Sequence, residues 1–463
     1  PLRRLIHKQR KLFDKQKGNA KASKIAKQYR NFKSSLQKAM RKAYWDHIES
    51  IIGDSTIEQE KPANTKRFWH FIKNQRQEAQ GIAPLKKEGK LIDDPVDKAN
   101  ILNNQFRSVF SPQQPLPLKD QCQRTLKFQT PQSTDAPAPI MEEIEITEPG
   151  VLKLLQQLKP EKAAGPDSIR PCILKELAIE ITPIVTRIFR ASYLQGKLPS
   201  IWKKANVSPI YKKGEKYKAV NYRPVSLTCI LCKQLEHIIA SQYMKHLNNN
   251  DLLYSKQHEF RHKLSCETQL IEFTTDAMKI VQDKQQCDTI VMDFSKAFDK
   301  VAHEHLLYKL DRTGIDPKAR KWIGSFLMGR SQRVVIDGEF SDHVPVTSGV
   351  PQGSVLGPIL FLVFINDMPQ YTKNANIRLF ADDTIAYLTI SSIDDCQRLQ
   401  DNLQRLEQWE KDWLMEFHPA KCNILRITKK KSKFIFPYNL HGHTLEEVTT
   451  AKYLGITISN DMS

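Results

Sequence analysis

The pattern of hydrophobic and polar positions predicts helices separated by short strands from about residue 140 onward. Apolar residues recur every three or four positions in the segments expected to be helical, which are 151–158, 229–247, 305–310, 318–328 and 399–413. Short apolar runs predict strands at 205–211, 223–227, 289–293, 332–337 and 343–346. We expect breaks at Pro171 and Pro183, because proline interrupts a helix. Strands separated by helices indicate an α+β fold, with helices on one face of an antiparallel sheet.

The part of the chain before this body differs in composition. Residues 1–110 carry helical signals, and about fifteen Lys and Arg residues with almost no acids lie between Arg3 and Lys42. Residues 111–140 are rich in Pro, Gln, Ser and Thr, which is typical of a linker. We therefore expect a basic, mostly helical N-terminal region over 1–110, a linker over 111–140, and a larger folded region after it.

The charge balance indicates a polyanionic partner. The chain contains 71 Lys and Arg residues against 51 Asp and Glu residues, a formal net charge of +20. A surplus of this size attracts nucleic acid, although a basic tail on a neutral enzyme would give the same total. The longest apolar run, 359–365, is far shorter than the ~20 residues that a membrane helix needs, so no membrane partner is expected.

Eight cysteines are scattered along the chain, which favours a reduced, intracellular compartment. Cys229 and Cys232 form a CxxC. No second pair of ligands follows them, so we interpret them as packed thiols rather than as a zinc site.

Three aspartates form the candidate catalytic site. Asp382 and Asp383 lie between two apolar runs, 377–379 and 384–388, which places them at the tip of a predicted β-hairpin. Asp293 ends an apolar strand about ninety residues upstream. Carboxylates arranged in this way can hold two Mg²⁺ ions roughly 3.5–4 Å apart, the spacing that in-line phosphoryl displacement needs. A solvated surface doublet is the alternative, but carboxylates among apolar neighbours favour a cation site, and the three acids therefore predict a polymerase.

Two further segments could contact a nucleotide. The loop 348–358 contains Gln352 and glycines that let a backbone or a base approach closely. Lys212, Lys213 and Arg223 lie on or beside two neighbouring predicted strands, where they could clamp a triphosphate. A tight turn before a buried helix and a solvated basic turn are the corresponding structural alternatives.

With these pieces in order, the chain resembles the reverse transcriptases of non-LTR retrotransposons, particularly the jockey-like group. The matching strings are AAGPDSIRPCILKELA (163–178), PIYKKGEKYKAVNYRPVSLT (209–228), FRHKLSCETQL (260–270), DFSKAFDKVAHEHLLYKL (293–310), SGVPQGSVLGPILF (348–361), FADD (380–383), FHPAKC (417–422) and KYLGITIS (452–459). Weaker similarity, in KRFWHFIK (66–73) and FRSVFS (106–111), extends into the N-terminal region.

This resemblance implies a right-hand polymerase, with fingers and palm over 141–445 and the primer grip and start of the thumb over 446–463. The implied partners are an RNA template, a DNA primer and dNTPs. The implied cofactors are two Mg²⁺ ions, with Mn²⁺ as a substitute. The implied metal ligands are Asp293, Asp382, Asp383 and the backbone carbonyl of Phe294.

The resemblance also implies roles for other residues. Phe298 falls at the sugar gate, where a ring excludes the 2′-OH of ribonucleotides. Lys421 matches a lysine that protonates the departing pyrophosphate, a general-acid role. The implied dNTP contacts are Lys212, Lys213, Arg223, Phe294, Phe298, Gln352 and Gly353. The implied template and primer contacts are Arg261, Tyr453, Leu454 and Gly455.

Some features depart from the family pattern. Glu259 replaces the glycine usual before Phe260, which places an acid near the expected template path, and Ala302 stands where proline is commoner. The chain ends at Ser463, just after the primer grip, so we expect most of the thumb and the endonuclease of this family to be missing. The expected function is an RNA-directed DNA polymerase. A catalytically inactive, nucleic-acid-binding relic or host-recruited derivative is the alternative.

Overall fold

The computed structural model describes residues 31–42, 81–111 and 138–462. The chain divides into two compact units, Pro1–Gly81 and Ile82–Ser463. In the first unit, residues 31–42 form a helix within the basic block, the Lys- and Arg-rich stretch from Arg3 to Lys42. The rest of that block, and nearly all of the expected linker, lie outside the described residues.

Residues 82–111 belong to the second unit. The hairpin of β1 (Leu85–Lys87) and β2 (Lys90–Ile92) leads into α4 (Pro95–Arg107), which starts with proline after its N-cap residue. The buried apolar residues of α4 share a core cluster with residues of β3 (Lys204–Tyr211) and β6 (Arg330–Ile336). The division between the two units therefore falls between Gly81 and Ile82.

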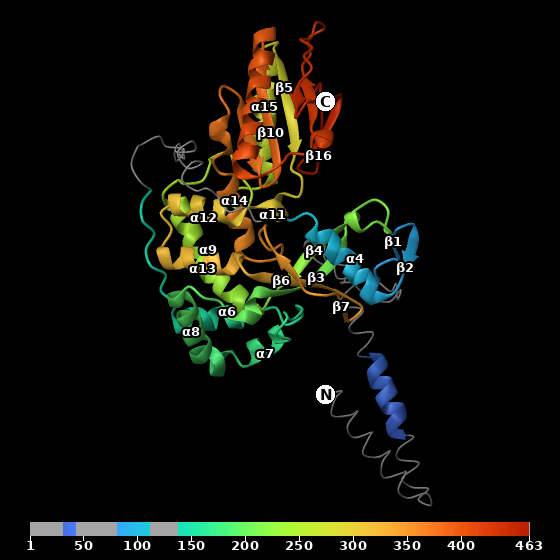
Figure 1. Ribbon diagram of the computed structural model, residues 1–463, viewed down its shortest axis with the longest axis vertical. Helices are drawn as coiled ribbons and strands as arrows, with labels where there is room; N and C mark the ends of the chain where they lie inside the picture. The colour runs from blue at the N-terminus through green and yellow to red at the C-terminus, as the bar shows by residue number, and fades with distance from the viewer. Residues whose placement is uncertain (1–30, 43–80, 112–137, 463) are drawn as a thin grey trace, which may run out of the picture. The chain divides into compact units, whose positions relative to one another are not determined.

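A five-stranded central sheet forms one half of the larger unit (Figure 1). Its order is β14 (Glu446–Val448), β11 (Asn423–Ile427), β5 (Gln286–Asp293), β10 (Asp383–Ile390) and β9 (Asn376–Phe380). All neighbours are antiparallel except β14 and β11, which are parallel. The α+β class is therefore confirmed, with a sheet that is mixed at one edge.

Both faces of this sheet are covered, so the expectation of helices on one face was wrong. Helix α15 (Ile393–Trp413) packs on one face, and α10 (Cys266–Gln282) with the hairpin of β15 (Thr450–Tyr453) and β16 (Ile456–Ser459) packs on the other. The burial of the central strand β5 agrees with two covered faces. This strand is buried at nearly every position and not at every second one. A strand buried on both faces has an almost continuous apolar run.

A second sheet is built from β4 (Tyr222–Leu227), β3 (Lys204–Tyr211), β6 (Arg330–Ile336) and β7 (Glu339–Phe340), with β8 (Val344–Val346) also paired to β6. The strands β3 and β4 form an antiparallel hairpin, and β3 runs parallel to β6. The remaining short strands are β12 (Asn439–Leu440) and β13 (His443–Thr444).

The other helices pack around the two sheets and against one another (Figure 1). They are α6 (Glu148–Gln156), α7 (Pro171–Glu176), α8 (Ala178–Gln195), α9 (Ile230–Asn249), α11 (Ala297–Lys300), α12 (His303–Arg312), α13 (Pro317–Leu327) and α14 (Leu356–Ile365). Short 3₁₀ turns are η1 (Ser200–Lys203), η2 (Ala219–Asn221), η3 (Met368–Tyr371) and η4 (Pro419–Lys421). The segments expected to be helices and strands from residue 151 onward match these elements, except that α15 starts at Ile393 and not at residue 399.

The expected break at Pro183 does not occur. Helix α8 continues through this residue. The missing N–H of Pro183 would have bonded the carbonyl of Ile179, which lies in the first turn of the helix. Ile179 is exposed, so water can reach this end of the helix. Pro171 does mark a boundary, since it is the first residue of α7.

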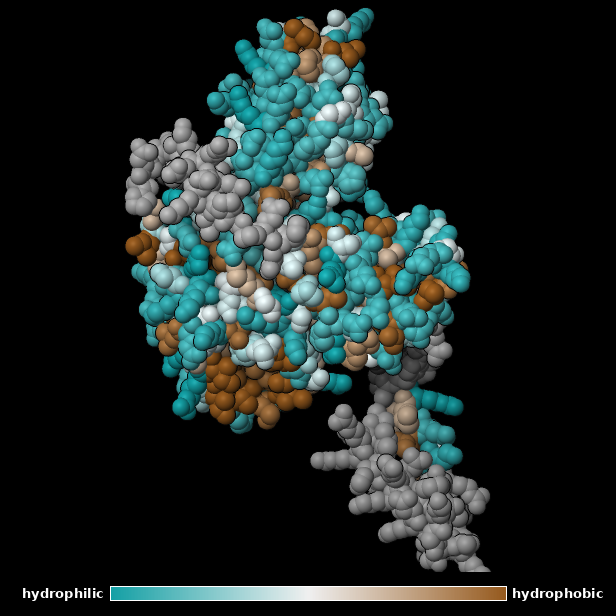
Figure 2. Space-filling model, in the orientation of Figure 1, coloured by the Kyte–Doolittle hydropathy of each residue, from teal (hydrophilic) through white to brown (hydrophobic). Residues whose placement is uncertain are grey.

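Helices α7 and α8 expose a group of apolar side chains. Ile173, Leu177, Ile184 and Ile188 are all exposed, and Figure 2 shows a brown patch over these helices on a mostly hydrophilic surface. Helix α8 is thus apolar both toward the core and toward this outer patch.

Cys229 and Cys232 lie in the core at the start of α9. Burial raises the pKa of Cys229 to about 12, and it raises the pKa of Cys232 well above its usual range. Both thiols therefore stay protonated and pack as apolar groups, as the sequence interpretation has it.

Within residues 31–42, 81–111 and 138–462, no helix combines the length and the apolar composition needed to cross a bilayer.

Candidate active site

The hairpin of β9 and β10 presents the aspartate doublet at its tip. Phe380 and Asp383 are paired in the antiparallel register, which leaves Ala381 and Asp382 as the two turn residues. On the other side of β10, Asp383 is paired directly with Asp293, the last residue of β5. Residues opposite one another in an antiparallel pair have Cα atoms about 4.5–5.5 Å apart. The structure therefore brings the three aspartates together from segments far apart in the chain.

The surroundings of these carboxylates disfavour their ionised forms. Burial is the main cause that raises the pKa of Asp382, and the charge of Asp293 adds to it. Burial, followed by repulsion from Asp382 and Asp293, raises the pKa of Asp383 to about 6. Lys212 and Arg223 act in the opposite direction on both residues. Aspartates crowded in this way need nearby positive charge.

This donor set fits divalent cations, because carboxylate oxygens are the ligands that Mg²⁺ prefers. The pKa values of Asp382 and Asp383 are raised first by burial and then by the neighbouring carboxylates, so a bound cation would stabilise their ionised forms. Asp293 Oδ2 accepts a hydrogen bond from Lys421 Nζ at 2.9 Å. Across the described part of the chain, no three His, Cys, Asp or Glu side chains are already arranged to hold a metal ion.

The predicted triphosphate contacts lie near the aspartates. Arg223 is opposite Ile210 in the β3–β4 hairpin, and the backbone N–H of Lys212 donates to Asn221 at 2.9 Å just beyond the paired strands. Burial and repulsion from Arg223 lower the pKa of Lys212, while the charge of Asp293 raises it. These mutual effects on the pKa values indicate that Lys212 and Arg223 lie within electrostatic reach of the carboxylates. Lys213 follows in the exposed loop.

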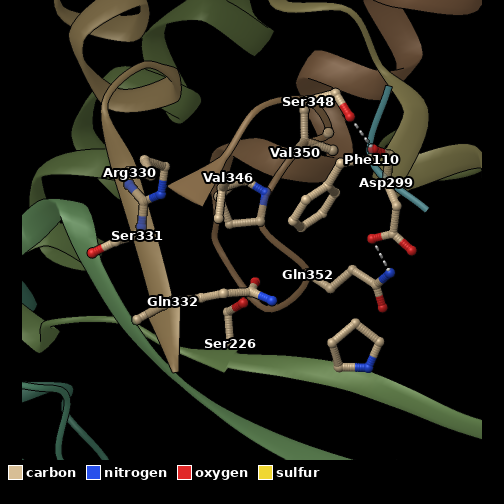
Figure 3. A pocket seen from close by; sticks show the side chains of 14 residues that line it. Phe110, Ser226, Asp299, Arg330, Ser331, Gln332, Val346, Ser348, Val350 and Gln352 are labelled. Carbon is tan, nitrogen blue, oxygen red and sulfur yellow. Dashed lines mark hydrogen bonds between the residues drawn. The ribbon is translucent and has the colours of Figure 1, made fainter. Parts of the chain in front are cut away.

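The loop that carries Gln352 and Gly353 is tied to two other segments (Figure 3). The side-chain NH₂ group of Gln352 donates to Asp299 Oδ1 at 2.8 Å. The backbone carbonyl of Gln352 accepts from the N–H of Ser226 at 2.8 Å. Gly353 has φ +99°, and a Cβ there would lie 3.0 Å from the carbonyl oxygen of Ser226. Only glycine therefore fits this approach to β4 without strain.

Asp299 was not predicted as a functional residue. It is buried beneath this loop, where Ser348 Oγ donates to its carbonyl at 2.7 Å in addition to the bond from Gln352 (Figure 3). Burial raises the pKa of Asp299. A buried aspartate whose carboxylate holds Gln352 fixes the loop relative to α11. A lone aspartate at this position carries no sign in the sequence that it will be buried against a loop.

The two phenylalanines after Asp293 differ in their exposure to the site. Phe294 is 3% exposed and stacks on Phe417 with ring centroids 4.3 Å apart, so its side chain cannot contact a nucleotide. The implied dNTP contact of the Phe294 side chain is therefore corrected, and only its backbone can take part. Phe298 is partly buried, stacks on Phe361, and accepts a backbone hydrogen bond from Val350 in the loop before Gln352.

The implied template and primer residues are partly internal. Arg261 donates to the carbonyl of Tyr254 at 3.0 Å within its own loop. The side chain of Tyr453 is 3% exposed and packs edge-on against Phe273, so this ring belongs to the core. Leu454 and Gly455 form the turn between β15 and β16, with φ of +48° and +87°. A primer could therefore meet this turn but not the ring of Tyr453.

Glu259 lies beside the aspartate doublet. Its backbone N–H donates to Gln257 Oε1 at 3.0 Å, and the same oxygen accepts from the N–H of Ala381 at 3.2 Å. Burial, followed by repulsion from Asp382 and Asp383, raises the pKa of Glu259 to about 7. The acid that departs from the family pattern thus adds negative charge to the site.

The replacement Glu259→Gln is expected to stabilise the metal-free protein by about 1–3 kcal/mol at about pH 8. The folded-state pKa is raised from 4.5 to about 7, so the folded protein binds this proton more tightly and wild-type stability falls as the pH rises through that window. Glutamine does not titrate and removes the loss. Urea unfolding in EDTA measures the difference in the free energy of unfolding between variant and wild type. This difference should be small near pH 4.5 and largest above about pH 7. A difference that does not grow with pH would contradict this account.

Comparison with known proteins agrees with these features. Residues 210–458 match the profile of the family described as "Reverse transcriptase (RNA-dependent DNA polymerase)". The "Probable RNA-directed DNA polymerase from transposon BS" of Drosophila melanogaster is 28% identical over 86% of this chain and 44% of the relative. The "RNA-directed DNA polymerase from mobile element jockey" of the same species is 28% identical over 80% of this chain and 40% of the relative. The chain thus spans less than half the length of these relatives. Because the family profile covers more than half of its residues, the chain belongs to the reverse transcriptase family.

Proposed function

We propose that this protein is an RNA-directed DNA polymerase of a non-LTR retrotransposon, which joins the 3′-OH of a DNA primer to the α-phosphate of a dNTP. The register that pairs Asp293 with Asp383, beside Asp382 at the hairpin tip, carries this proposal. The cations Lys212 and Arg223 support it, because they lie within electrostatic reach of the carboxylates, where a triphosphate would bind.

The domain assignment is part of the same proposal. Residues 141–445 form the fingers and palm, with the palm around the central sheet and the fingers around the β3–β4 hairpin. Residues 446–463 form the primer grip and the start of the thumb. The basic N-terminal region and the net charge of +20 supply phosphate contacts to an RNA template and a DNA primer.

Two Mg²⁺ ions, or Mn²⁺ in their place, would be held by Asp293, Asp382, Asp383 and the backbone carbonyl of Phe294, and when bound they activate the attacking oxygen and stabilise the leaving one. Arg223 supplies a two-pronged donor for phosphate oxygens, and Lys212 and Lys213 supply point charges.

The remaining residues orient the nucleotide and complete the proton transfer. Gln352, held by Asp299, presents its loop to the incoming nucleotide together with Gly353. Lys421 is the general acid for the departing pyrophosphate. Its Nζ lies 2.9 Å from Asp293 Oδ2, so this side chain lies beside the proposed metal ligands. Arg261 and the turn at Leu454 and Gly455 lie on the path of template and primer.

Primer extension on an RNA template, measured beside nucleic-acid binding, tests the proposed function. We expect dNTP incorporation that depends on Mg²⁺ and on the template. Binding without extension would instead support the alternative, a nucleic-acid-binding relic or host-recruited derivative. Extension without a template would indicate a different nucleotidyl transferase and would overturn the proposal.

The replacement Phe298→Ala is expected to raise the incorporation of ribonucleotides relative to dNTPs by about 10-fold or more. The ring of Phe298, supported by Phe361, would exclude the 2′-OH, and alanine leaves room for it. Competing rNTP and dNTP in a primer-extension assay gives the ratio. As a control, Phe340→Ala removes an exposed ring on β7 and should leave the ratio unchanged. An unchanged ratio in Phe298→Ala would exclude the sugar-gate role.

A further inference from the structure

Gln257 belongs to the segment that precedes α10, and its side chain reaches the tip of the β9–β10 hairpin. The backbone of this segment runs beside β9, since the N–H of Leu379 donates to Lys256 at 3.1 Å and the N–H of His258 donates back to Leu379 at 3.2 Å. The side chain of Gln257 is 1% exposed. Its Oε1 accepts from the N–H of Ala381 at 3.2 Å and from the N–H of Glu259 at 3.0 Å. One amide oxygen therefore links the turn residue before the doublet to the neighbouring segment.

Ala381 has a backbone conformation that alanine rarely adopts. Its φ is +47°, in the left-handed region, where a Cβ meets the backbone unfavourably. Two-residue hairpin turns usually place Gly, Asn or Asp at such positions. Ala381 is followed directly by Asp382 and Asp383, so any relaxation of its backbone would redirect both carboxylates.

The orientation of the Gln257 amide is determined by its partners. Reversing the amide would set its NH₂ group against two N–H donors, so the oxygen must face Ala381 and Glu259. The NH₂ group is buried and finds no hydrogen-bond partner among the described residues. A buried unpaired donor costs stability. Stability alone therefore does not account for a glutamine here, whereas the bond to Ala381 does.

We propose that Gln257 is a positioning residue of the polymerase site, which holds the left-handed conformation of Ala381 and thereby sets the directions of Asp382 and Asp383. This inference rests on the proposed function, in which these carboxylates bind the metal ions. Gln257 acts through the turn and not by touching the substrate. Its role matches that of the outer groups that orient metal ligands in other enzymes.

The replacement Gln257→Met keeps the length of the side chain and removes the acceptor. We expect the kcat of primer extension to fall by about 10-fold to 100-fold, with little change in the KM for dNTP. We also expect the affinity of the nucleic-acid-free protein for Mn²⁺ to fall by about 10-fold, measured by titration calorimetry. Adding Ala381→Gly to Gln257→Met should restore much of both losses, because glycine adopts positive φ without support.

Gln286→Met is the matched control. Gln286 is also fully buried, and its Oε1 accepts a backbone N–H, that of Phe434, at 2.9 Å. It lies at the opposite end of β5 from Asp293. The NH₂ group of Gln286 also donates to Asp288 Oδ1 and to the carbonyl of Phe434. We therefore expect Gln286→Met to lower the thermal stability at least as much as Gln257→Met does, while kcat and Mn²⁺ affinity stay unchanged.

Wild-type kcat and Mn²⁺ affinity in Gln257→Met would overturn the proposal, and so would equal losses in Gln286→Met. Failure of rescue by Ala381→Gly would refute the action through the turn. If the wild-type protein binds Mn²⁺ but does not extend a primer, the proposed polymerase function fails, and the Mn²⁺ measurements still decide the role of Gln257.

Discussion

Replacement of Asp293 by Asn is expected to lower Mg²⁺-dependent extension of a DNA primer on RNA by about 10³-fold or more. Asp293 is paired in register with Asp383, so its carboxylate is the one that closes the cluster from the neighbouring strand. An amide has the same shape but lacks the charge that two divalent ions require. Single-turnover extension at saturating dNTP separates this loss from weaker nucleotide binding.

Asp394→Asn provides the matched control for that experiment. Asp394 belongs to another Asp-Asp doublet, but it is exposed in the first turn of α15. Its replacement should leave extension within a factor of about two, since exposed surface changes have small effects. Thermal unfolding should show that Asp293→Asn is folded, because the substitution removes one of several repelling carboxylates. Substantial extension by a folded Asp293→Asn protein would refute the two-metal assignment.

Replacement of Asp367 by Ala is expected to lower the free energy of unfolding by about 3–5 kcal/mol, because it leaves a buried cation without its partner. Lys309 is completely buried, and its Nζ lies 2.6 Å from Asp367 Oδ1 and 3.5 Å from the centre of the Trp413 ring. Asp367 also accepts from the indole N–H of Trp409 at 3.0 Å. This pair joins α12 to the segment after α14 and to α15. Urea denaturation measures the loss.

Burial lowers the pKa of Lys309 to about 8 even with its partner present. Asp367 holds the pKa of Lys309 up, so in Asp367→Ala the lysine loses its proton at a lower pH than in the wild type. The loss should therefore shrink as the pH rises toward about 8, above which the lysine is neutral in both proteins. The double replacement Lys309→Met with Asp367→Leu should be much closer to wild type, since an apolar pair leaves no buried charge. Asp311 of α12 forms an exposed pair with Arg320 of α13, and Asp311→Ala, which breaks this pair, should cost less than about 1 kcal/mol. Equal losses in the buried and exposed pairs would contradict the explanation.

Most helices and strands of the larger unit could be predicted from the sequence. The 3.6-residue and two-residue periodicities are local, so elements such as α13 and β3 were expected nearly at their observed bounds. The errors have physical causes. Helix α8 passes through Pro183 because the lost bond falls near its exposed start. The central sheet has two covered faces because β5 is buried on both, which periodicity alone does not distinguish from a single covered face.

The candidate site was predicted in its residue types more than in its geometry. The apolar flanks of Asp382 and Asp383 distinguished them from the doublets at 93–94 and 394–395, which lie at helix starts. Asp299 and Gln257 were missed, because a lone polar residue gives no sign in sequence that it will be buried against a loop or a turn.

By itself the sequence determined the order of the elements, the family, and the set of acids and bases available for chemistry, because these are properties of local patterns and motifs. Only the tertiary structure decided which residues meet. It paired Asp293 with Asp383, turned the rings of Phe294 and Tyr453 into the core, and set Gln257 against the hairpin tip. Such outcomes depend on strand register and packing between distant segments, where many weak contacts together select one arrangement.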